Sequence, residues 1–222
     1  MTEVVLGVDV GTTSVKVTAF DAEGGEHGHG ECEHELREPA PGRAVQDPDA
    51  LVAATLTAVR SAVEQARERG AGIAGLSLSA AMHGLVALDA DGRPLTELMT
   101  WGDTRAAEQA ERLRAEHPGL HGRTGTPLHP MSPLAKLCWL REHEPETVRA
   151  ARRFVGIKEL ALHALTGEWA LDHGVASGTG LMAIRDLDWD AEALGLAGVR
   201  PEQLAPLVEG KRQLELSADV GL

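Results

Sequence analysis

The chain contains no tyrosine, and its 222 residues include only two phenylalanines and four tryptophans. The hydrophobic core must therefore be built from alanine, leucine and valine. Cysteine is also scarce: Cys32 and Cys138 lie far apart in the sequence, and two cysteines do not make a disulfide framework. Because an apolar leader segment is missing as well, we expect the protein to work in the reducing cytoplasm.

Positive charge is in short supply. The 21 Lys and Arg residues face 34 Asp and Glu residues, which gives a formal net charge of −13. This balance argues against nucleic acid and anionic membranes as partners, because phosphate groups would be repelled. A small anionic ligand is still allowed, since backbone N–H groups can bind it locally. No stretch approaches the length of a membrane span.

The first part of the chain shows the patterns of strands. Residues 4 to 10 form an apolar run, and residues 15 to 20 alternate like the strand that returns from it. Residues 25 to 36 resemble a third, polar strand at a sheet edge. Its three histidines and one cysteine divide between the two faces of such a strand, so we do not expect a four-ligand metal site, and a site of two histidines is the weaker interpretation.

The remainder predicts one helix, two strands and then mostly helices. Asp47-Pro48-Asp49 supplies an N-cap, a proline at the first helical position and an acid in the first turn. Residues 73 to 79 read as a buried strand with residues 84 to 88 as its neighbour. We expect further helices to begin at Asp103, Ser132 and Ile157. This order indicates one α/β layer with helical additions.

The stretch GVDVGTTSVK, residues 7 to 16, carries the first candidate site. A carboxylate inside an apolar run costs roughly several kcal/mol to bury unpaired, so we expect Asp9 to be buried beside a cation or strong donors. The turn that follows offers N–H groups and hydroxyls that suit phosphate oxygens. Asp9 could hold Mg²⁺ through water, and Lys16 could face a terminal phosphate. The candidate residues are Asp9, Gly11, Thr12, Thr13 and Lys16.

Two more candidate sites follow. SLSAAMHG, residues 77 to 84, ends a predicted buried strand, where ligands collect in open α/β sheets. TWGDTR, residues 100 to 105, places a tryptophan beside an acid and a guanidinium, which suits a polyhydroxylated or carboxylate ligand. The alternative is a helix start with Asp103 as its N-cap, and the two interpretations are compatible. The candidate residues are Met82, His83, Gly84, Trp101, Asp103 and Arg105.

MSPLAKLCWLREH, residues 131 to 143, predicts an amphipathic helix by its own pattern. Four apolar positions are expected to face inward, and Lys136 and Trp139 need no function on that pattern. The inward residues are Leu134, Leu137, Cys138 and Leu140.

These motifs together resemble a known family. GVDVGTTSVK is similar to the first phosphate loop of the actin, Hsp70 and sugar kinase superfamily, and MSPLAKLCWLREH resembles the first signature of the FGGY carbohydrate kinases. SAAMHG, TWGDTR, TGTPLHPMSP and GIKE most resemble the gluconokinase branch. The resemblance runs from Leu6 to about Leu207. It implies a ribonuclease H-like, actin-like ATPase domain: a mixed α/β sheet flanked by helices with helical insertions.

The resemblance also implies roles. In this family, the carboxylate that matches Asp9 binds the Mg²⁺–ATP phosphates. The residues that match Gly11, Thr12 and Thr13 surround the transferred phosphoryl group, and a basic residue that matches Lys16 lies near it. The residues around His83 and Trp101 face the sugar. The expected reaction is ATP-dependent phosphorylation of a sugar or sugar acid, with gluconate favoured over xylulose as the substrate. Whether the protein forms a homodimer is left open.

The family's general base is an aspartate in a glycine-rich stretch, which we do not assign here; Asp219 lies in an unlike context. We therefore expect residues 1–222 to be an FGGY N-terminal domain without its C-terminal kinase domain, and inactive alone. A sugar-binding module without catalysis is the alternative from another class.

Overall fold

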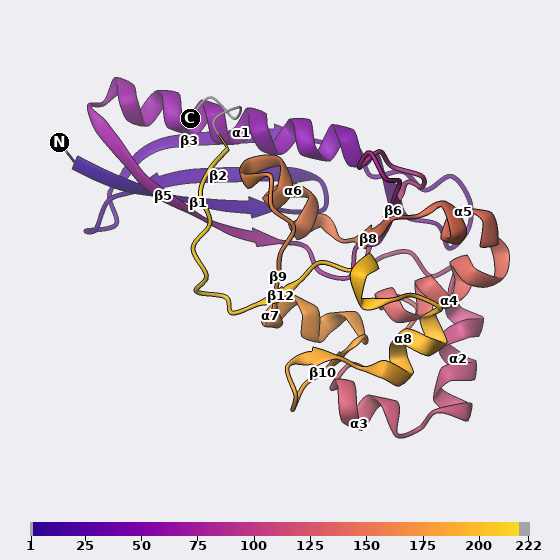
Figure 1. Cartoon of the computed structure of the whole chain (residues 1–222). Coiled ribbons are helices and arrows are strands. Elements are labelled where there is room, and N and C mark those ends of the chain that lie inside the picture. The colour runs from indigo at the N-terminus through magenta and orange to yellow at the C-terminus, as the bar shows by residue number, and fades with distance from the viewer. Residues whose placement is uncertain (1, 218–222) are drawn as a thin grey trace.

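The computed structural model describes residues 2–217 and contains a sheet layer joined to a helical part (Figure 1). The main sheet has the strand order β3-β2-β1-β5, with β1 antiparallel to β2 and parallel to β5. The expected α/β layer with helical additions is confirmed. Its strands are β1 (Thr2–Val10), β2 (Ser14–Phe20), β3 (Glu26–Glu33) and β5 (Ala71–Ala80).

Strand β1 alternates strictly between a buried and an exposed face. Val4, Leu6 and Val8 are at most 2% exposed, whereas Val5 and Asp9 face away from the core. The expectation that Asp9 is buried is therefore wrong. A strand with one covered face sends successive side chains to opposite sides, so the carboxylate reaches solvent although its neighbours are apolar.

Helices α1 (Pro48–Glu68) and α6 (Ile157–Thr166) cover one face of this sheet together. Helix α1 begins as predicted, since the Asp47 carboxylate accepts the N–H groups of Asp49 and Ala50. Gly70 follows its end with φ 78°, a left-handed conformation that glycine adopts without a steric penalty. The opposite face of the sheet, which carries Asp9, remains open.

Strand β3 approaches α1 so closely that two of its residues must be glycine. A Cβ atom added to Gly28 would overlap the carbonyl of Ala62, and one added to Gly30 would overlap the carbonyl of Ala58. Backbone meets backbone at this contact, so neither side has a flexible group that could move away. The polar edge strand expected between residues 25 and 36 is thus fixed to the sheet layer by α1.

Helix α4 (Pro133–His143) is the centre of the helical part. It contacts α2 (Ala107–Glu116) and α8 (Ala191–Ala197), and every residue from 133 to 140 is buried. The prediction of an amphipathic helix is therefore wrong, because neighbours surround α4 on all sides. Its four apolar residues do face inward as expected, but so do Lys136 and Trp139.

Of two predicted helix starts, the one at Asp103 is wrong, and the one at Ser132 is right in position but not in its capping bond. Asp103 does not begin α2, whose N-cap is Ala106, because the Asp103 carboxylate is bound to Arg105 instead. Ser132 does precede Pro133 at the start of α4, as predicted. Its hydroxyl, however, donates to the His129 carbonyl at 2.9 Å and caps nothing.

The strand β6 (Val86–Leu88) pairs with β8 (Arg153–Val155) and not with β5, so the neighbour expected for the strand over residues 73 to 79 is wrong. The chain turns away after β5 through His83, whose φ is 66°. The remaining elements are β4 (Val45–Gln46), β7 (Leu98–Met99), β9 (Leu171–Asp172), β10 (Met182–Ala183), β11 (Asp188–Trp189), β12 (Leu207–Val208), α3 (Leu120–Thr124), α5 (Pro145–Ala150) and α7 (His173–Ala176).

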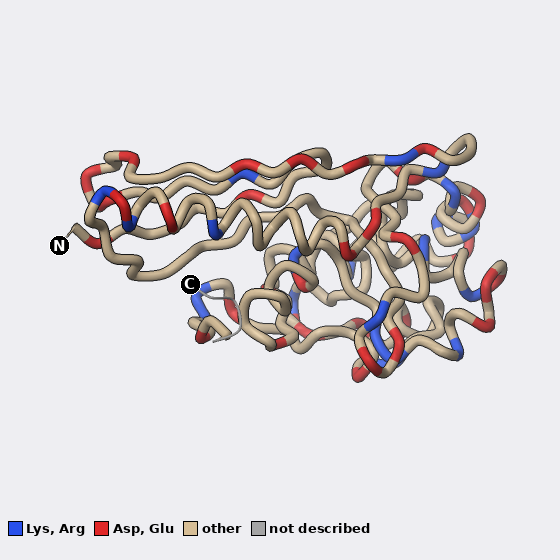
Figure 2. Tube along the Cα trace, turned by 90° about the horizontal axis from the view of Figure 1, so that it is seen from above, with Lys and Arg blue, Asp and Glu red and all other residues tan. Residues whose placement is uncertain are grey.

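Charged side chains are dispersed over both parts of the molecule. Figure 2 shows Lys and Arg interspersed with Asp and Glu along the trace. Within residues 2–217, no helix is long and apolar enough to cross a membrane. The same residues include no group of three or more His, Cys, Asp or Glu side chains that could hold a metal ion.

The contact between β3 and α1 yields a prediction about stability. Gly30→Ala should lower the free energy of unfolding by about 1–3 kcal/mol or more, because the added methyl group overlaps the Ala58 carbonyl. Urea denaturation measures the change. Gly75→Ala is the matched control, since a Cβ on this glycine of β5 meets nothing within 4 Å. Equal midpoints for the two variants would contradict the close approach.

Candidate active site

The carboxyl ends of β1 and β5 bring the candidate residues to one edge of the sheet. The two strands are parallel and end opposite each other, with Val10 beside Ala80. The N–H of Ala81 then donates to the Val10 carbonyl at 2.9 Å. The β1–β2 turn and the loop after β5 therefore start side by side, at the edge where open α/β sheets bind ligands.

The β1–β2 turn is held from outside through its carbonyl groups. The Gln46 side-chain amide donates to the Thr12 carbonyl at 2.6 Å, and the N–H of His34 donates to the Thr13 carbonyl at 3.0 Å. The turn closes through the N–H of Gly11, which donates to the Ser14 carbonyl at 3.0 Å. The hydroxyls of Thr12 and Thr13 remain beside the open face, so the turn presents hydrogen-bonding groups suited to an anion.

Asp9 belongs to a row of side chains across the open face of the sheet. The strand register places Glu31, Lys16, Asp9 and Ser79 next to one another on four adjacent strands. The Lys16 ammonium lies 3.7 Å from the Glu31 carboxylate. Among the residues that the structure describes, the Asp9 carboxylate has no hydrogen-bond or ion-pair partner, although its backbone is paired within the sheet. An exposed carboxylate beside hydroxyl groups supplies the oxygen ligands that a hydrated Mg²⁺ prefers.

Trp101 connects the turn to the second candidate region. Its indole N–H donates to the Thr12 hydroxyl at 3.0 Å, although the two residues are 89 positions apart. Trp101 itself is 52% exposed. An exposed aromatic surface therefore lies directly beside the hydroxyl-bearing turn.

Asp103 and Arg105 form a buried ion pair beneath this surface. The Arg105 guanidinium donates to both carboxylate oxygens of Asp103 at 2.8 and 2.7 Å, and the N–H of Ala44 adds a third donor at 3.0 Å. Asp103 is fully buried, so it supports the Arg105 side chain from inside. The guanidinium also lies over the Trp139 ring, 5.1 Å from its centre.

His83 adopts a left-handed backbone conformation that non-glycine residues rarely adopt, and both its ring and its backbone carbonyl are hydrogen-bonded. Its Nδ1 lies 2.9 Å from the Gly178 carbonyl. A carbonyl only accepts, so Nδ1 carries the proton and Nε2 of the neutral ring is an acceptor. Burial lowers the pKa of His83, which favours the neutral form at pH 7. Nε2 is therefore equipped to accept a bond from a ligand hydroxyl.

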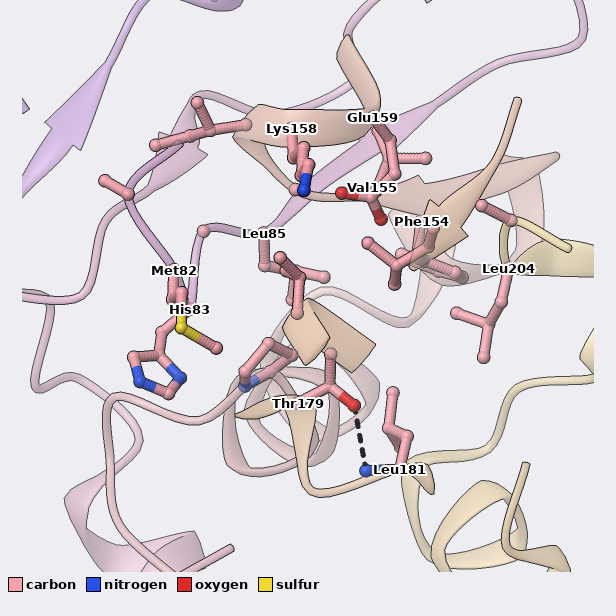
Figure 3. A pocket seen from close by; sticks show the side chains of 18 of the residues that line it. Met82, His83, Leu85, Phe154, Val155, Lys158, Glu159, Thr179, Leu181 and Leu204 are labelled. Atoms are coloured by element: carbon pink, nitrogen blue, oxygen red, sulfur yellow. Dashed lines mark hydrogen bonds between the residues drawn. The ribbon is translucent and has the colours of Figure 1, made fainter. Parts of the chain in front are cut away.

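Met82 and His83 also line a small pocket, with Lys158 and Glu159 entering it from α6 (Figure 3). The cavity measures about 30 Å³, which is room for water but not for a sugar. Trp101, Asp103 and Arg105 do not line it. The pocket therefore shares Met82 and His83 with the candidate site, but not its Trp101 and Arg105 side.

Glu159 is the unusual group of the pocket. Burial raises the pKa of its carboxyl to about 7, against backbone hydrogen bonds at the start of α6 that act in the opposite direction. The neighbouring Lys158 is engaged with Asp172 at 2.6 Å. Lys158 is therefore already paired with an acid and does not neutralise Glu159 by direct contact.

Lys136, to which the helix pattern assigned no function and which was only an alternative to Arg105 as partner of a carboxylate, is completely buried. Its ammonium donates to the carbonyls of His83 at 2.6 Å and Thr100 at 2.7 Å, with a longer bond of 3.4 Å to Met99. Burial lowers its pKa to about 7, although the nearby Asp103 carboxylate acts against this shift. The sequence pattern predicted that α4 is amphipathic, and a lysine on such a helix is expected to face solvent.

Sequence reasoning missed Gln46 and Gly178. Gln46 is fully buried behind the β1–β2 turn, and it precedes the helix cap Asp47, where a polar residue attracts no notice. Gly178 lies against His83: a Cβ there would meet the His83 ring at 3.2 Å. Its signal would have been the small-residue stretch ASGTG at residues 176 to 180. Asp219 lies outside the described residues.

The architecture is that of the sugar kinases with an actin-like ATPase fold. A gluconate kinase from Lactobacillus acidophilus superposes with a TM-score of 0.93 and 28% identity, over 99% of this chain and 45% of that one. The chain belongs to the FGGY family of carbohydrate kinases, because the model of the family's N-terminal domain matches residues 4–218. The predicted family and fold are thereby confirmed.

Curated relatives agree with this assignment. A gluconokinase from Bacillus subtilis (strain 168) is 37% identical over 210 residues, which is 94% of this chain and 40% of the relative. A xylulose kinase from Streptomyces rubiginosus is 35% identical over 226 residues, or 96% of this chain and 46% of the relative. The chain therefore spans less than half the length of the curated relatives it matches.

Glu159 generates a prediction about pH. Its carboxyl has a pKa raised from 4.5 to about 7, so its stabilising contribution is complete below pH 4.5 and is lost as pH rises through 7. At about 1.4 kcal/mol per pKa unit, the loss amounts to at most about 3.5 kcal/mol. Glu159→Gln should remove this part of the decline in unfolding free energy between pH 4.5 and 7.5.

Urea denaturation at several pH values measures the difference between Glu159→Gln and the unaltered chain. Glu64→Gln, on the exposed side of α1, is the matched control and should leave the pH profile unchanged. Parallel pH profiles for Glu159→Gln and the unaltered protein would show that the carboxyl is not held neutral by burial.

Proposed function

We propose that this chain is the sugar-binding N-terminal domain of a two-domain, ATP-dependent kinase that phosphorylates a sugar or sugar acid, with gluconate as substrate and 6-phosphogluconate as product. The observation that carries the proposal is the hydrogen bond from Trp101 to the Thr12 hydroxyl. It joins the turn suited to phosphate to the exposed aromatic surface suited to a polyol. A phosphoryl donor and a hydroxyl acceptor must meet at such a junction.

The turn would receive the ATP phosphates. Gly11, Thr12 and Thr13 would surround the transferred phosphoryl group, with Lys16 as a nearby positive charge. Asp9 would hold Mg²⁺ through water. When bound, Mg²⁺ neutralises charge on the phosphate oxygens. The general base is not assigned to a residue of this chain, so phosphoryl transfer would require a second domain that closes over the site.

The sugar would lie against Trp101, whose ring offers apolar surface to the C–H face of a polyol. His83 would accept a hydrogen bond from a sugar hydroxyl through Nε2. Its neighbours Met82 and Gly84 would form the adjacent wall of the sugar site. Arg105, oriented by Asp103, would meet the carboxylate of gluconate through a guanidinium edge. Similarity to gluconokinases and the TGTPLHPMSP stretch favour gluconate over xylulose. The cytoplasmic location and the homodimer stay predictions.

Calorimetric titration of the chain with gluconate, xylulose and glycerol tests the substrate. We expect gluconate to bind with the lowest Kd, because only it offers a carboxylate to Arg105. An ADP-release assay on the same samples should detect no turnover by the chain alone. Tighter binding of xylulose would replace gluconate as the substrate, and no binding of any of the three would contradict the sugar site.

Asp9 is tested by phosphoryl transfer in the two-domain kinase. Asp9→Asn should reduce kcat at least about a hundredfold, since charge stabilisation through a bound metal is worth several kcal/mol. Its gluconate Kd should be unchanged, because the carboxylate would serve the phosphates. Glu31→Gln is the matched control on the same row of the sheet and should keep kcat. Near-normal turnover by Asp9→Asn would refute the assignment.

A further inference from the structure

Lys136 joins the two loops that carry the proposed sugar contacts. Its ammonium reaches the His83 carbonyl at 2.6 Å and the Thr100 carbonyl at 2.7 Å. The first carbonyl belongs to the peptide that links His83 to Gly84, and the second to the peptide that links Thr100 to Trp101. One side chain from α4 thus fixes the backbone next to both residues expected to touch the sugar.

The contact to His83 has a specific consequence, because this residue is strained. A non-glycine residue at φ 66° persists only when its surroundings hold it there. The Gly178 carbonyl holds the His83 ring and the Lys136 ammonium holds its backbone carbonyl. Together they fix the direction of Nε2.

Lys136 has no donor left for a ligand. An ammonium has three N–H donors, and the carbonyls of His83, Thr100 and Met99 account for three acceptors. Its side chain is fully buried as well. Asp103, whose charge acts on Lys136, is already paired with Arg105. Lys136 can therefore act on a ligand only through the loops.

We propose that Lys136 is a positioning residue that sets the placement of His83 relative to Trp101 and thereby makes the sugar surface. This inference deepens the proposed function and rests on it for the identity of the ligand. The arrangement of the two loops does not depend on that identity, so the inference has a readout of its own.

The readout is the indole N–H signal of Trp101 in an NMR spectrum of the nitrogen-labelled chain. The four tryptophans give four indole signals, and Trp101→Phe identifies the one that is bonded to Thr12. In Lys136→Met the Thr100 carbonyl keeps the N–H of Asp103 but loses the ammonium donor at 2.7 Å, so the Trp101 signal should shift. Gluconate should also bind at least about tenfold more weakly, since small displacements of binding groups have large effects.

Leu140→Ala is the matched control. Leu140 is fully buried on the same helix but contacts neither loop through a hydrogen bond, so its loss lowers Tm without moving the Trp101 signal. Lys136→Gln is a second, milder variant, because its amide keeps two N–H donors. It should fall between the unaltered protein and Lys136→Met, and it replaces Lys136→Met if the latter does not fold.

The inference is overturned if the substitutions of Lys136 leave the Trp101 signal and the gluconate Kd within the range of Leu140→Ala. It is supported if the signal moves and Kd rises while Leu140→Ala changes only Tm. If the unaltered chain does not bind gluconate, the proposed substrate fails, and the Trp101 signal alone decides whether Lys136 positions the loops.

Discussion

The parallel pairing of β1 with β5 is the constraint on which the rest of the site depends. Parallel strands need a long crossover, and here α1 supplies it while covering one face of the sheet. Because the strands run the same way, the turn after β1 and the loop after β5 emerge at one edge. An antiparallel β5 would have placed His83 at the far end of the sheet, away from the hydroxyls of Thr12 and Thr13.

The two acids of the site are placed in opposite environments. Asp9 faces solvent on the open sheet surface, while Asp103 is fully buried and bound to Arg105. A buried carboxylate is tolerated only with strong donors, and the guanidinium provides two. Asp9 needs no such compensation, so it stays available for an external cation. The Asp103 carboxylate therefore orients the Arg105 side chain, whereas the Asp9 carboxylate is free to bind a ligand cation.

Local patterns predicted the elements well but not their surroundings. The cap at Asp47 and the left-handed Gly70 are fixed by neighbours in sequence, and α1 begins and ends as predicted. Asp9 was expected to be buried and is exposed, and Lys136 lies on a helix expected to be amphipathic and is buried. Both outcomes depend on which face a distant element covers. The junction of Thr12 with Trp101 also could not be foreseen from spacing, since 89 residues separate them. The motifs identified the family, and only the tertiary contacts show how they meet.

The Thr12 hydroxyl has a consequence for how two ligands would influence each other. It accepts a hydrogen bond from the Trp101 indole N–H and keeps its own O–H to donate. A hydroxyl that accepts a bond becomes a slightly better donor, by about 10–30% of a bond worth about 1 kcal/mol. Linkage is reciprocal, so occupancy of either side would strengthen the other by the same factor. That factor is below about twofold, so this bond would fix the distance between the two proposed subsites but would contribute negligibly to cooperativity.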